Sequence, residues 1–330
     1  MNTTKTAQSS EQAFSLLNCV LSSIAVLGNA VVLLTVARYK ELRKRECIYL
    51  IAGLAFMDMC SGIGGLIYNL SRLLHQLEQI SCSKGLILLL GQVQVSSIMG
   101  SQLMTLAIAW DRFDVFNNLM TYKSKPHKSY ALKSFLTSLL YCTSLYFPIY
   151  LFVDLHQVPE FCSVVGAMLP WYGYYWTVFI LCVGFSVLYL YVRSLILMQK
   201  VQKPLKAGNH RDLALERQIK VTKTVCIVLG FYTVFWFLPN FGFIVTHLAQ
   251  TGVWLTTKFD AAVSVGSYLN ASANVGIYVV RNGSLRDFLL GFLKCKKPGH
   301  VHPATVAPNK SATRTRPANG APKSKALPRA

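Results

Sequence analysis

The chain has 330 residues, of which 53% are hydrophobic and only 14% are charged. Soluble globular domains carry about 25% charged residues, so this composition is typical of a protein that lies in a membrane. The formal net charge of +20 could suit a nucleic-acid-binding protein, but the positions of the basic residues favour a membrane topology instead.

Seven stretches of the sequence are long enough to cross a bilayer, which takes roughly 20 predominantly apolar residues. Apart from Asp58 they contain no charged residue, and they lie between the charged residues that bound 11–38, 46–72, 84–111, 133–154, 160–193, 223–258 and 260–281. Only helices and closed barrels satisfy every backbone group inside lipid. We therefore predict an all-α protein, a bundle of seven transmembrane helices.

The basic residues predict how the bundle is oriented. With the N-terminus extracellular, 29 of the 33 Lys and Arg residues fall on the cytoplasmic side. Such an excess marks the cytoplasmic side of a membrane protein. The sequence thus predicts a multi-pass plasma-membrane protein with an extracellular N-terminus and a cytoplasmic C-terminus. Anionic lipid of the inner leaflet is an expected partner, and nucleic acid is not.

The two ends of the chain differ in character. Residues 1–13 are expected to form an extracellular tail, 14–297 the membrane domain, and 298–330 a disordered basic cytoplasmic tail. After the seventh stretch, apolar residues recur with helical spacing at Leu285, Phe288, Leu289, Phe292 and Leu293. This pattern predicts a short amphipathic helix, an eighth, on the membrane surface.

Two modification sites follow from this topology. Among five N-x-S/T sequons, Asn2 is the credible glycan acceptor, because it lies outside and away from the membrane. Cys295 stands among lysines at the end of the surface helix, where it is either an S-palmitoylation site or a plain free thiol.

Five polar motifs fall on the predicted spans in a characteristic order. They are Gly28-Asn29, the segment 54–58 ending in Asp58, Asp111-Arg112-Phe113, the segment 236–239 ending in Pro239, and the segment 274–278 from Asn274 to Tyr278. In order and spacing they resemble the GN, LAxxD, DRY, CWxP and NPxxY signatures of the rhodopsin-like (class A) G-protein-coupled receptors. The resemblance covers residues 14–297.

The motifs depart from that pattern at three places. Phe113 replaces the tyrosine of DRY, and Val275 replaces the proline of NPxxY. The tryptophan of the sixth span, Trp236, stands one place early, so that Phe237 occupies the usual tryptophan position. Such relaxed motifs resemble divergent serpentine receptors, for example the SRSX type.

The resemblance implies an activation switch. Arg112 would be held by Asp111 and released to meet the G protein, and the other members of the switch would be Phe113, Phe237, Pro239, Asn274 and Tyr278. Many family members add a second lock from an acid on the sixth span. Here that position holds Ile219, which predicts raised basal activity.

Asp58 is the one carboxylate deep inside a span. A buried aspartate must be paired, protonated or bound to a metal ion, unless it is merely tolerated. The resemblance implies an allosteric sodium ion held by Asp58, Ser101, Asn270 and Asn274, and oxygen atoms are the ligands that hard cations prefer. No other cofactor is expected.

The resemblance also implies a disulfide between Cys82 and Cys162, and an extracellular ligand cavity. Candidate cavity residues are Gln94, Trp236 and Tyr268. Gln94 stands where amine receptors carry an aspartate, and Tyr268 where opsins carry the retinal lysine. Neither a cationic amine nor retinal is therefore an expected ligand.

The leading functional hypothesis is a receptor that transduces binding of an unidentified extracellular ligand into activation of a heterotrimeric G protein. The alternative is a membrane transporter or channel, which usually shows internal repeats and several intramembrane charges. An enzyme is not expected, because the sequence contains no HExxH, GxSxG or paired catalytic aspartates.

Overall fold

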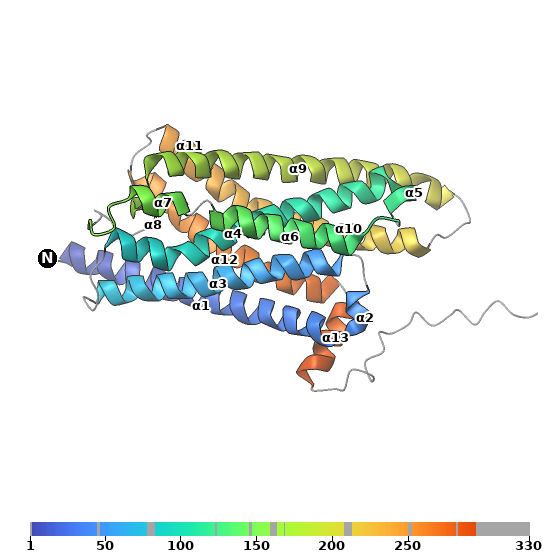
Figure 1. Ribbon diagram of the computed structural model, residues 1–330, viewed down its shortest axis with the longest axis horizontal. Helices are drawn as coiled ribbons and strands as arrows, with labels where there is room; N and C mark the ends of the chain where they lie inside the picture. Colours follow the sequence, from blue (N-terminus) through green and yellow to red (C-terminus); the bar gives the residue numbers. More distant parts are fainter. Residues whose placement is uncertain are drawn as a thin grey trace, which may run out of the picture.

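Long helices run side by side along the molecule (Figure 1). The computed structural model describes residues 2–44, 47–77, 83–122, 124–144, 147–158, 164–167, 169–207, 213–249, 253–281 and 283–294. Within these ranges the chain forms helices and no strand. The predicted all-α, seven-helix bundle is confirmed.

The seven transmembrane segments are made as follows. They are α1 (Asn2–Arg38), α3 (Ile48–Gln76), α4 (Lys84–Asn117), α6 (His127–Ser144) followed by α7 (Phe147–Phe152), α9 (Pro170–Ala207), the sixth segment, and α12 (Val253–Arg281). The sixth segment consists of α10 (Leu213–Tyr232), the π-helical turn η1 (Thr233–Phe237) and α11 (Leu238–Leu248). Four shorter helices are α2 (Lys40–Arg43), α5 (Leu119–Tyr122), α8 (Val164–Ala167) and α13 (Gly283–Leu293).

Length and hydropathy mark five membrane-crossing helices among the described residues. They are Glu11–Arg38, Ile48–Gln76, Lys84–Asn117, Trp171–Gln202 and Thr222–Thr246. The fourth and seventh segments are more polar along their helices, and they complete the bundle by packing: α6 lies against α3 and α4, and α12 lies against α1 and α11.

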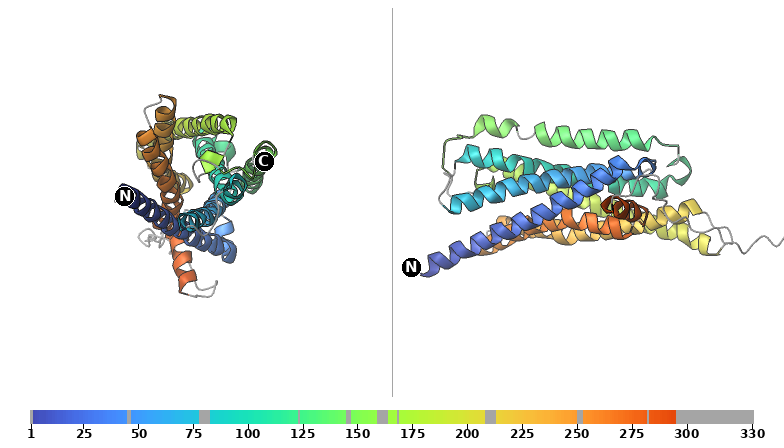
Figure 2. Two further views of the ribbon diagram at one scale, coloured as in Figure 1. Left: turned by 90° about the vertical axis from the view of Figure 1, so that its left-hand side faces the viewer. Right: turned by 90° about the horizontal axis from the view of Figure 1, so that it is seen from below.

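The two ends of the folded chain refine the predicted boundaries. Residues 2–13, expected to be a tail, are helical and continue into α1 without a break. The predicted surface helix is α13, which leaves the bundle at a steep angle (Figure 2). It is fixed by Phe288, whose ring lies 4.7 Å from that of Tyr39 and is 1% exposed.

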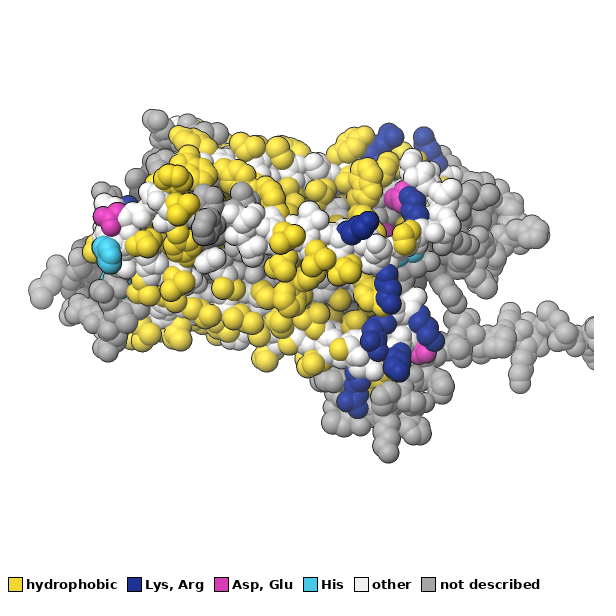
Figure 3. Space-filling view, in the orientation of Figure 1, with side chains coloured by type: hydrophobic (Ala, Val, Ile, Leu, Met, Phe, Trp, Pro, Cys, Tyr) yellow, Lys and Arg dark blue, Asp and Glu magenta, His cyan; other side chains and the backbone are white. Residues whose placement is uncertain are grey.

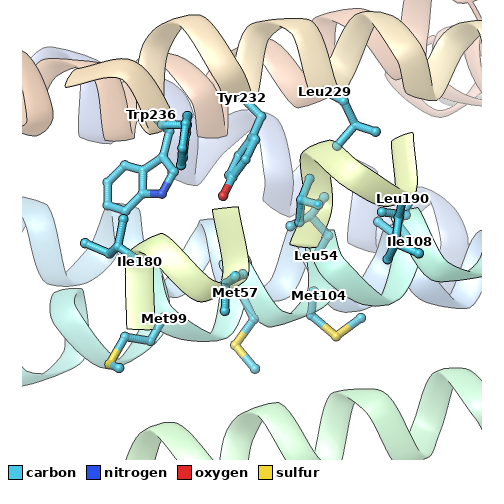
Figure 4. Packing of buried hydrophobic residues seen from close by; sticks show 14 of the residues in the cluster. Leu54, Met57, Met99, Met104, Ile108, Ile180, Leu190, Leu229, Tyr232 and Trp236 are labelled. Carbon is cyan, nitrogen blue, oxygen red and sulfur yellow. The ribbon is translucent and has the colours of Figure 1, made fainter. Parts of the chain in front are cut away.

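The core lies between α3, α4, α9 and the sixth segment (Figure 4). Methionines of α3 and α4 fill spaces that glycines leave open. A Cβ added to Gly53 would lie 2.7 Å from Met104 Cε, and one added to Gly100 would lie 2.7 Å from Met57 Sδ. Small residues let membrane helices approach closely, so these contacts set the distance between α3 and α4.

Charge is distributed unevenly along the bundle. In Figure 3, hydrophobic side chains cover the middle of the visible face, and Lys and Arg side chains gather at the end where α2 and α13 lie. We call this the basic end. The opposite end carries the start of α1 and the end of α3, and we call it the N-terminal end.

Candidate functional site

Asp58 on α3 lies at the centre of the polar core and is 2% exposed. Ser101 Oγ on α4 donates a hydrogen bond to Asp58 Oδ1 at 2.6 Å, and Asn274 Nδ2 on α12 donates one to Oδ2 at 2.9 Å. These bonds tie three helices to one carboxylate. Both donors are neutral, so they bind the oxygens without supplying the positive charge that a buried carboxylate needs.

A small cavity lies beside Asp58, with room for about one water-sized particle. It is lined by Asp58, Ser61, Ile98, Ser101, Gln102, Trp236, Ser267, Asn270 and Ala271. Three buried oxygens in this region have no hydrogen-bond partner: Gln102 Oε1, Asn270 Oδ1 and Asn274 Oδ1. These oxygens and the carboxylate are of the ligand type that hard cations prefer, so the chemistry of the residues fits such an ion.

All four residues predicted to hold sodium therefore lie together. Ser101 and Asn274 contact Asp58 directly, and Asn270 lines the cavity. Sequence reasoning missed the other polar lining residues, Ser61, Gln102 and Ser267. Two of them could have been found by helical spacing, because Ser61 follows Asp58 by three residues and Ser267 precedes Asn270 by three.

The sixth segment reaches this cavity through the π-helical turn η1. The N–H of Leu238 donates to the carbonyl of Thr233, five residues earlier, instead of four. The turn therefore holds one extra residue, and both Trp236 and Phe237 are buried, at 2% and 5% exposed.

The extra residue changes which aromatic side chain meets the polar core. Trp236 lines the cavity beside Asp58, and its Nε1 has no hydrogen-bond partner. Phe237 instead packs on α9, edge-on to Phe185 with ring centres 5.3 Å apart and against Gly184. Trp236, and not Phe237, is therefore the aromatic residue beside the cavity, while the switch role assigned to Phe237 stays a prediction.

Pro239 and Gly266 explain how the π-turn is accommodated. Pro239 has no N–H, so the carbonyl of Phe235, four residues earlier, loses its usual helical donor. That carbonyl points at α12, where a Cβ added to Gly266 would lie only 1.8 Å from it. Asn240 supports the same turn, because its Nδ2 donates to the carbonyl of Trp236 at 2.8 Å.

Arg112 is buried at the basic end of α4, 3% exposed. Its Nε donates to Asp111 Oδ2 at 3.0 Å, and its Nη2 contacts the same oxygen. The predicted pairing of Asp111 with Arg112 is thus present. Phe113 does not join the pair; it packs at the edge of the core with its ring 5.8 Å from that of Trp110.

Tyr122 is a third member of this cluster that the sequence did not indicate. It lies on the short helix α5 and is 3% exposed. Its hydroxyl donates to Asp111 Oδ1 at 3.0 Å and accepts a long hydrogen bond from Arg112 Nη2 at 3.4 Å. Its ring lies 4.4 Å from that of His127 at the start of α6. The loop helix therefore closes over the ion pair.

Ile219, which stands where an acid could form a second lock, is partly buried in an apolar cluster with Val115, Phe116 and Tyr122. The position where many family members carry the second acid is therefore occupied by an apolar side chain that packs against the cluster containing Tyr122.

Two of the candidate ligand residues contact each other. Gln94 Nε2 donates to the hydroxyl of Tyr268 at 2.6 Å, and Asn69 Nδ2 donates to the same hydroxyl at 3.1 Å. Tyr268 is completely buried. This cluster lies on the N-terminal side of the Asp58 cavity, so the third candidate, Trp236, belongs to a deeper layer than Gln94 and Tyr268.

Several predicted sites lie outside the residues that the structure describes. Cys82, Cys162 and Cys295 are among them, so the disulfide and the palmitoylation site stay predictions. Asn2 and Tyr278 lie on described helices, but their side chains are not described.

Seven helices around a polar core define a multi-pass membrane protein of the seven-helix type. The family model of the 7 transmembrane receptors (rhodopsin family) matches residues 28–278, and the chain belongs to this family. The match runs from Gly28 of the first motif to Tyr278 of the last. A comparison with curated proteins found no match. The chain is thus a G-protein-coupled receptor in the general sense, and the SRSX subtype stays a prediction.

Proposed function

We propose that this receptor sits in the plasma membrane with its N-terminus outside and converts binding of an extracellular ligand into activation of a heterotrimeric G protein. The observation that carries the proposal is the buried Asp111–Arg112–Tyr122 cluster at the basic end. A buried ion pair is costly to desolvate, so it gives weak support to stability and is better explained as a switch.

The cluster suits a two-state mechanism. In the state described here, Arg112 is engaged by Asp111 and Tyr122 and turned away from solvent. A second state, in which Arg112 leaves these partners, would expose a cation to a G protein at the cytoplasmic surface. A ligand that binds the second state more tightly shifts the population toward it by its differential affinity.

We further propose that Asp58, Ser101, Asn270 and Asn274 hold a sodium ion. When bound, the ion supplies the positive charge that the neutral partners of Asp58 lack. The unpartnered oxygens of Asn270 and Asn274 support this assignment, because a buried acceptor without a donor is stabilised by a cation. The four residues come from α3, α4 and α12, and the ion can bind only when these three helices hold the residues close together. The ion would therefore favour the state in which the helices have this arrangement.

Arg112→Ala tests the proposed function. We expect normal surface delivery and loss of both basal and ligand-stimulated nucleotide exchange on the G protein. Surface delivery is measured with an epitope tag placed ahead of Asn2 and stained on intact cells, which tests the orientation in the same assay. Arg193→Ala is the matched control, because Arg193 is exposed on α9. Unchanged exchange in Arg112→Ala, or a tag that stains only after permeabilisation, would contradict the proposal.

Tyr122→Phe is expected to raise basal signalling. The change removes the hydroxyl that bonds Asp111 and accepts from Arg112, and keeps the ring that packs on His127. Loss of a hydrogen bond to a charged group is worth about 1.5–3 kcal/mol, which corresponds to an increase of about ten- to a hundredfold in the population with Arg112 released.

The control for Tyr122→Phe is Tyr130→Phe. The Tyr130 hydroxyl donates to the Ala107 carbonyl at 3.1 Å, so this variant also loses one hydrogen bond near the basic end without touching the ion pair. Basal nucleotide exchange is normalised to surface receptor in both variants. If basal exchange rises equally in the two variants, the cause is a general loss of packing at the basic end and not the release of Arg112.

A further inference from the structure

The inward face of α1 carries a row of polar residues. Glu11, Ser15, Asn18 and Ser22 follow one another at intervals of four, three and four residues, which places them on one face of the helix. Ser15, Asn18 and Ser22 are completely buried, and Glu11 is exposed at the N-terminal end, where its Oε2 accepts a hydrogen bond from Gln76 at 3.4 Å. A buried polar row is expensive in a membrane protein unless it serves a purpose.

Much of this row lacks hydrogen-bond partners. Asn18 Nδ2 donates to Ser264 Oγ on α12 at 3.2 Å. The remaining oxygens, Ser15 Oγ, Asn18 Oδ1 and Ser22 Oγ, are buried without a partner. Buried acceptors of this kind are normally satisfied by water or by an ion. Three of them on successive turns of one helix therefore point to a hydrated seam between α1, α3 and α12.

The row leads to the Asp58 cavity and stops at Tyr268. Ser22 lies beside the Tyr268 hydroxyl without an aligned hydrogen bond. The Tyr268 hydroxyl occupies the space beside Gly65 on α3. A Cβ added to Gly65 would lie 2.5 Å from this hydroxyl oxygen. Ser61, one turn along α3 from Gly65, lines the cavity, as does Ser267, the neighbour of Tyr268. Tyr268 therefore stands between the polar row and the cavity.

We propose that the face of α1 from Glu11 to Ser22 is the path by which a monovalent cation moves between extracellular water and the Asp58 cavity, with Tyr268 as its gate. Glu11 would raise the local cation concentration at the mouth. The unpartnered oxygens along the row would replace part of the ion's hydration shell. Opening the gate requires Tyr268 to leave Asn69 and Gln94, the two donors that hold its hydroxyl. The proposal rests on the sodium site proposed above.

The path is tested with silver ion, a monovalent cation that reacts with thiols in contact with water. Asn18→Cys and Ser15→Cys place a thiol in the row, and Val20→Cys places one at the same depth on the lipid-facing side, where Val20 is 57% exposed. The full-length receptor in nanodiscs is treated in chloride-free buffer, and peptide-resolved mass spectrometry separates these thiols from native ones such as Cys19. We expect both row thiols to react at least tenfold faster than the control. Equal, slow reaction at all three positions would overturn the path.

The gate is tested at Ser61→Cys, on the cavity side of Tyr268. We expect the Ser61→Cys thiol to react slowly with silver. Tyr268→Phe removes an interaction worth about 1 kcal/mol and should accelerate this reaction about three- to tenfold. Asn18→Leu fills the polar row with an apolar side chain and should slow the reaction. No change with Asn18→Leu would show that ions reach the cavity elsewhere and would overturn the proposal. Silver labelling does not depend on sodium binding, so it can succeed or fail independently of the sodium site, which Asp58→Asn tests.

Discussion

Gly266→Ala is expected to abolish the folded receptor at the cell surface. The added Cβ would lie 1.8 Å from the carbonyl oxygen of Phe235 and 3.0 Å from its carbon. Both are backbone atoms of η1, so no side chain can rotate out of the way. Either α12 moves away from the sixth segment or the π-turn rearranges, and both disturb the wall of the Asp58 cavity. We expect a loss of about 3 kcal/mol or more in the free energy of unfolding, measured as a lowered unfolding midpoint in detergent.

Gly276→Ala is the control on the same helix. A Cβ at Gly276 meets nothing within 4 Å, so alanine there should be neutral or slightly stabilising. A second variant ties the effect to the π-turn. Pro239→Ala restores an N–H that can draw the Phe235 carbonyl back into the helix, and it should partly rescue Gly266→Ala. Wild-type stability of Gly266→Ala would show that the close approach of α12 to η1 is not needed.

The polar core could be predicted from the sequence because the membrane restricts what a buried polar residue can be. Asp58 stands out as the one carboxylate deep in a span, and helical periodicity places Asn270 and Asn274 on one face. The family resemblance, and not polarity alone, added Ser101 to this set. In the structure Asp58, Ser101 and Asn270 line one small cavity, and Asn274 donates a hydrogen bond to Asp58. The pairing of Asp111 with Arg112 was predicted from the family resemblance of the Asp111-Arg112-Phe113 motif.

Other parts of the site depend on geometry that a regular helix does not predict. A period of 3.6 residues places Trp236 and Phe237 about 100° apart, and only the wider π-turn explains why both are buried and why Trp236 meets the cavity. Tyr122 was missed because it lies on a loop helix of four residues, whose position over Arg112 is set by tertiary packing. The bond between Gln94 and Tyr268 likewise joins residues 174 positions apart.

The Asp58 cavity and the Arg112 cluster are linked by a single helix. Ser101 and Arg112 are eleven residues apart on α4, which is three turns and about 16 Å. Ser101 binds Asp58 directly, and Asp111 binds both Arg112 and Tyr122. A rotation or shift of α4 that loosens one contact therefore acts on the other. Under the proposed two-state mechanism, α4 is the element through which an ion at Asp58 would influence the basic end.

Asp58→Asn is expected to abolish the effect of sodium on the receptor. In the wild type, replacing N-methylglucamine with sodium at constant ionic strength should lower basal nucleotide exchange about fivefold, at the lower end of usual allosteric coupling. Sodium should also raise the unfolding midpoint of the wild type, because an ion that binds only the folded state stabilises it by mass action. Asparagine has nearly the shape of aspartate. Its oxygen can still accept from Asn274 Nδ2 and its amide can donate to Ser101 Oγ, but it lacks the charge that attracts the ion.

Asp114→Asn is the matched control for this experiment. Asp114 is a carboxylate of α4, whereas Asp58 is on α3. Asp114 lies at the basic end, where it pairs with Lys125 at 2.5 Å, far along α4 from the cavity. It should keep the full response to sodium in both assays. The two assays separate binding from signalling. Suppose that sodium raises the unfolding midpoint of the wild type but not of Asp58→Asn, and leaves basal exchange unchanged. Sodium would then bind at Asp58 without affecting the equilibrium between signalling states. If the wild type and Asp58→Asn respond equally to sodium in both assays, the ion binds elsewhere, and the buried carboxylate must instead be neutralised by a proton shared with Ser101 or Asn274.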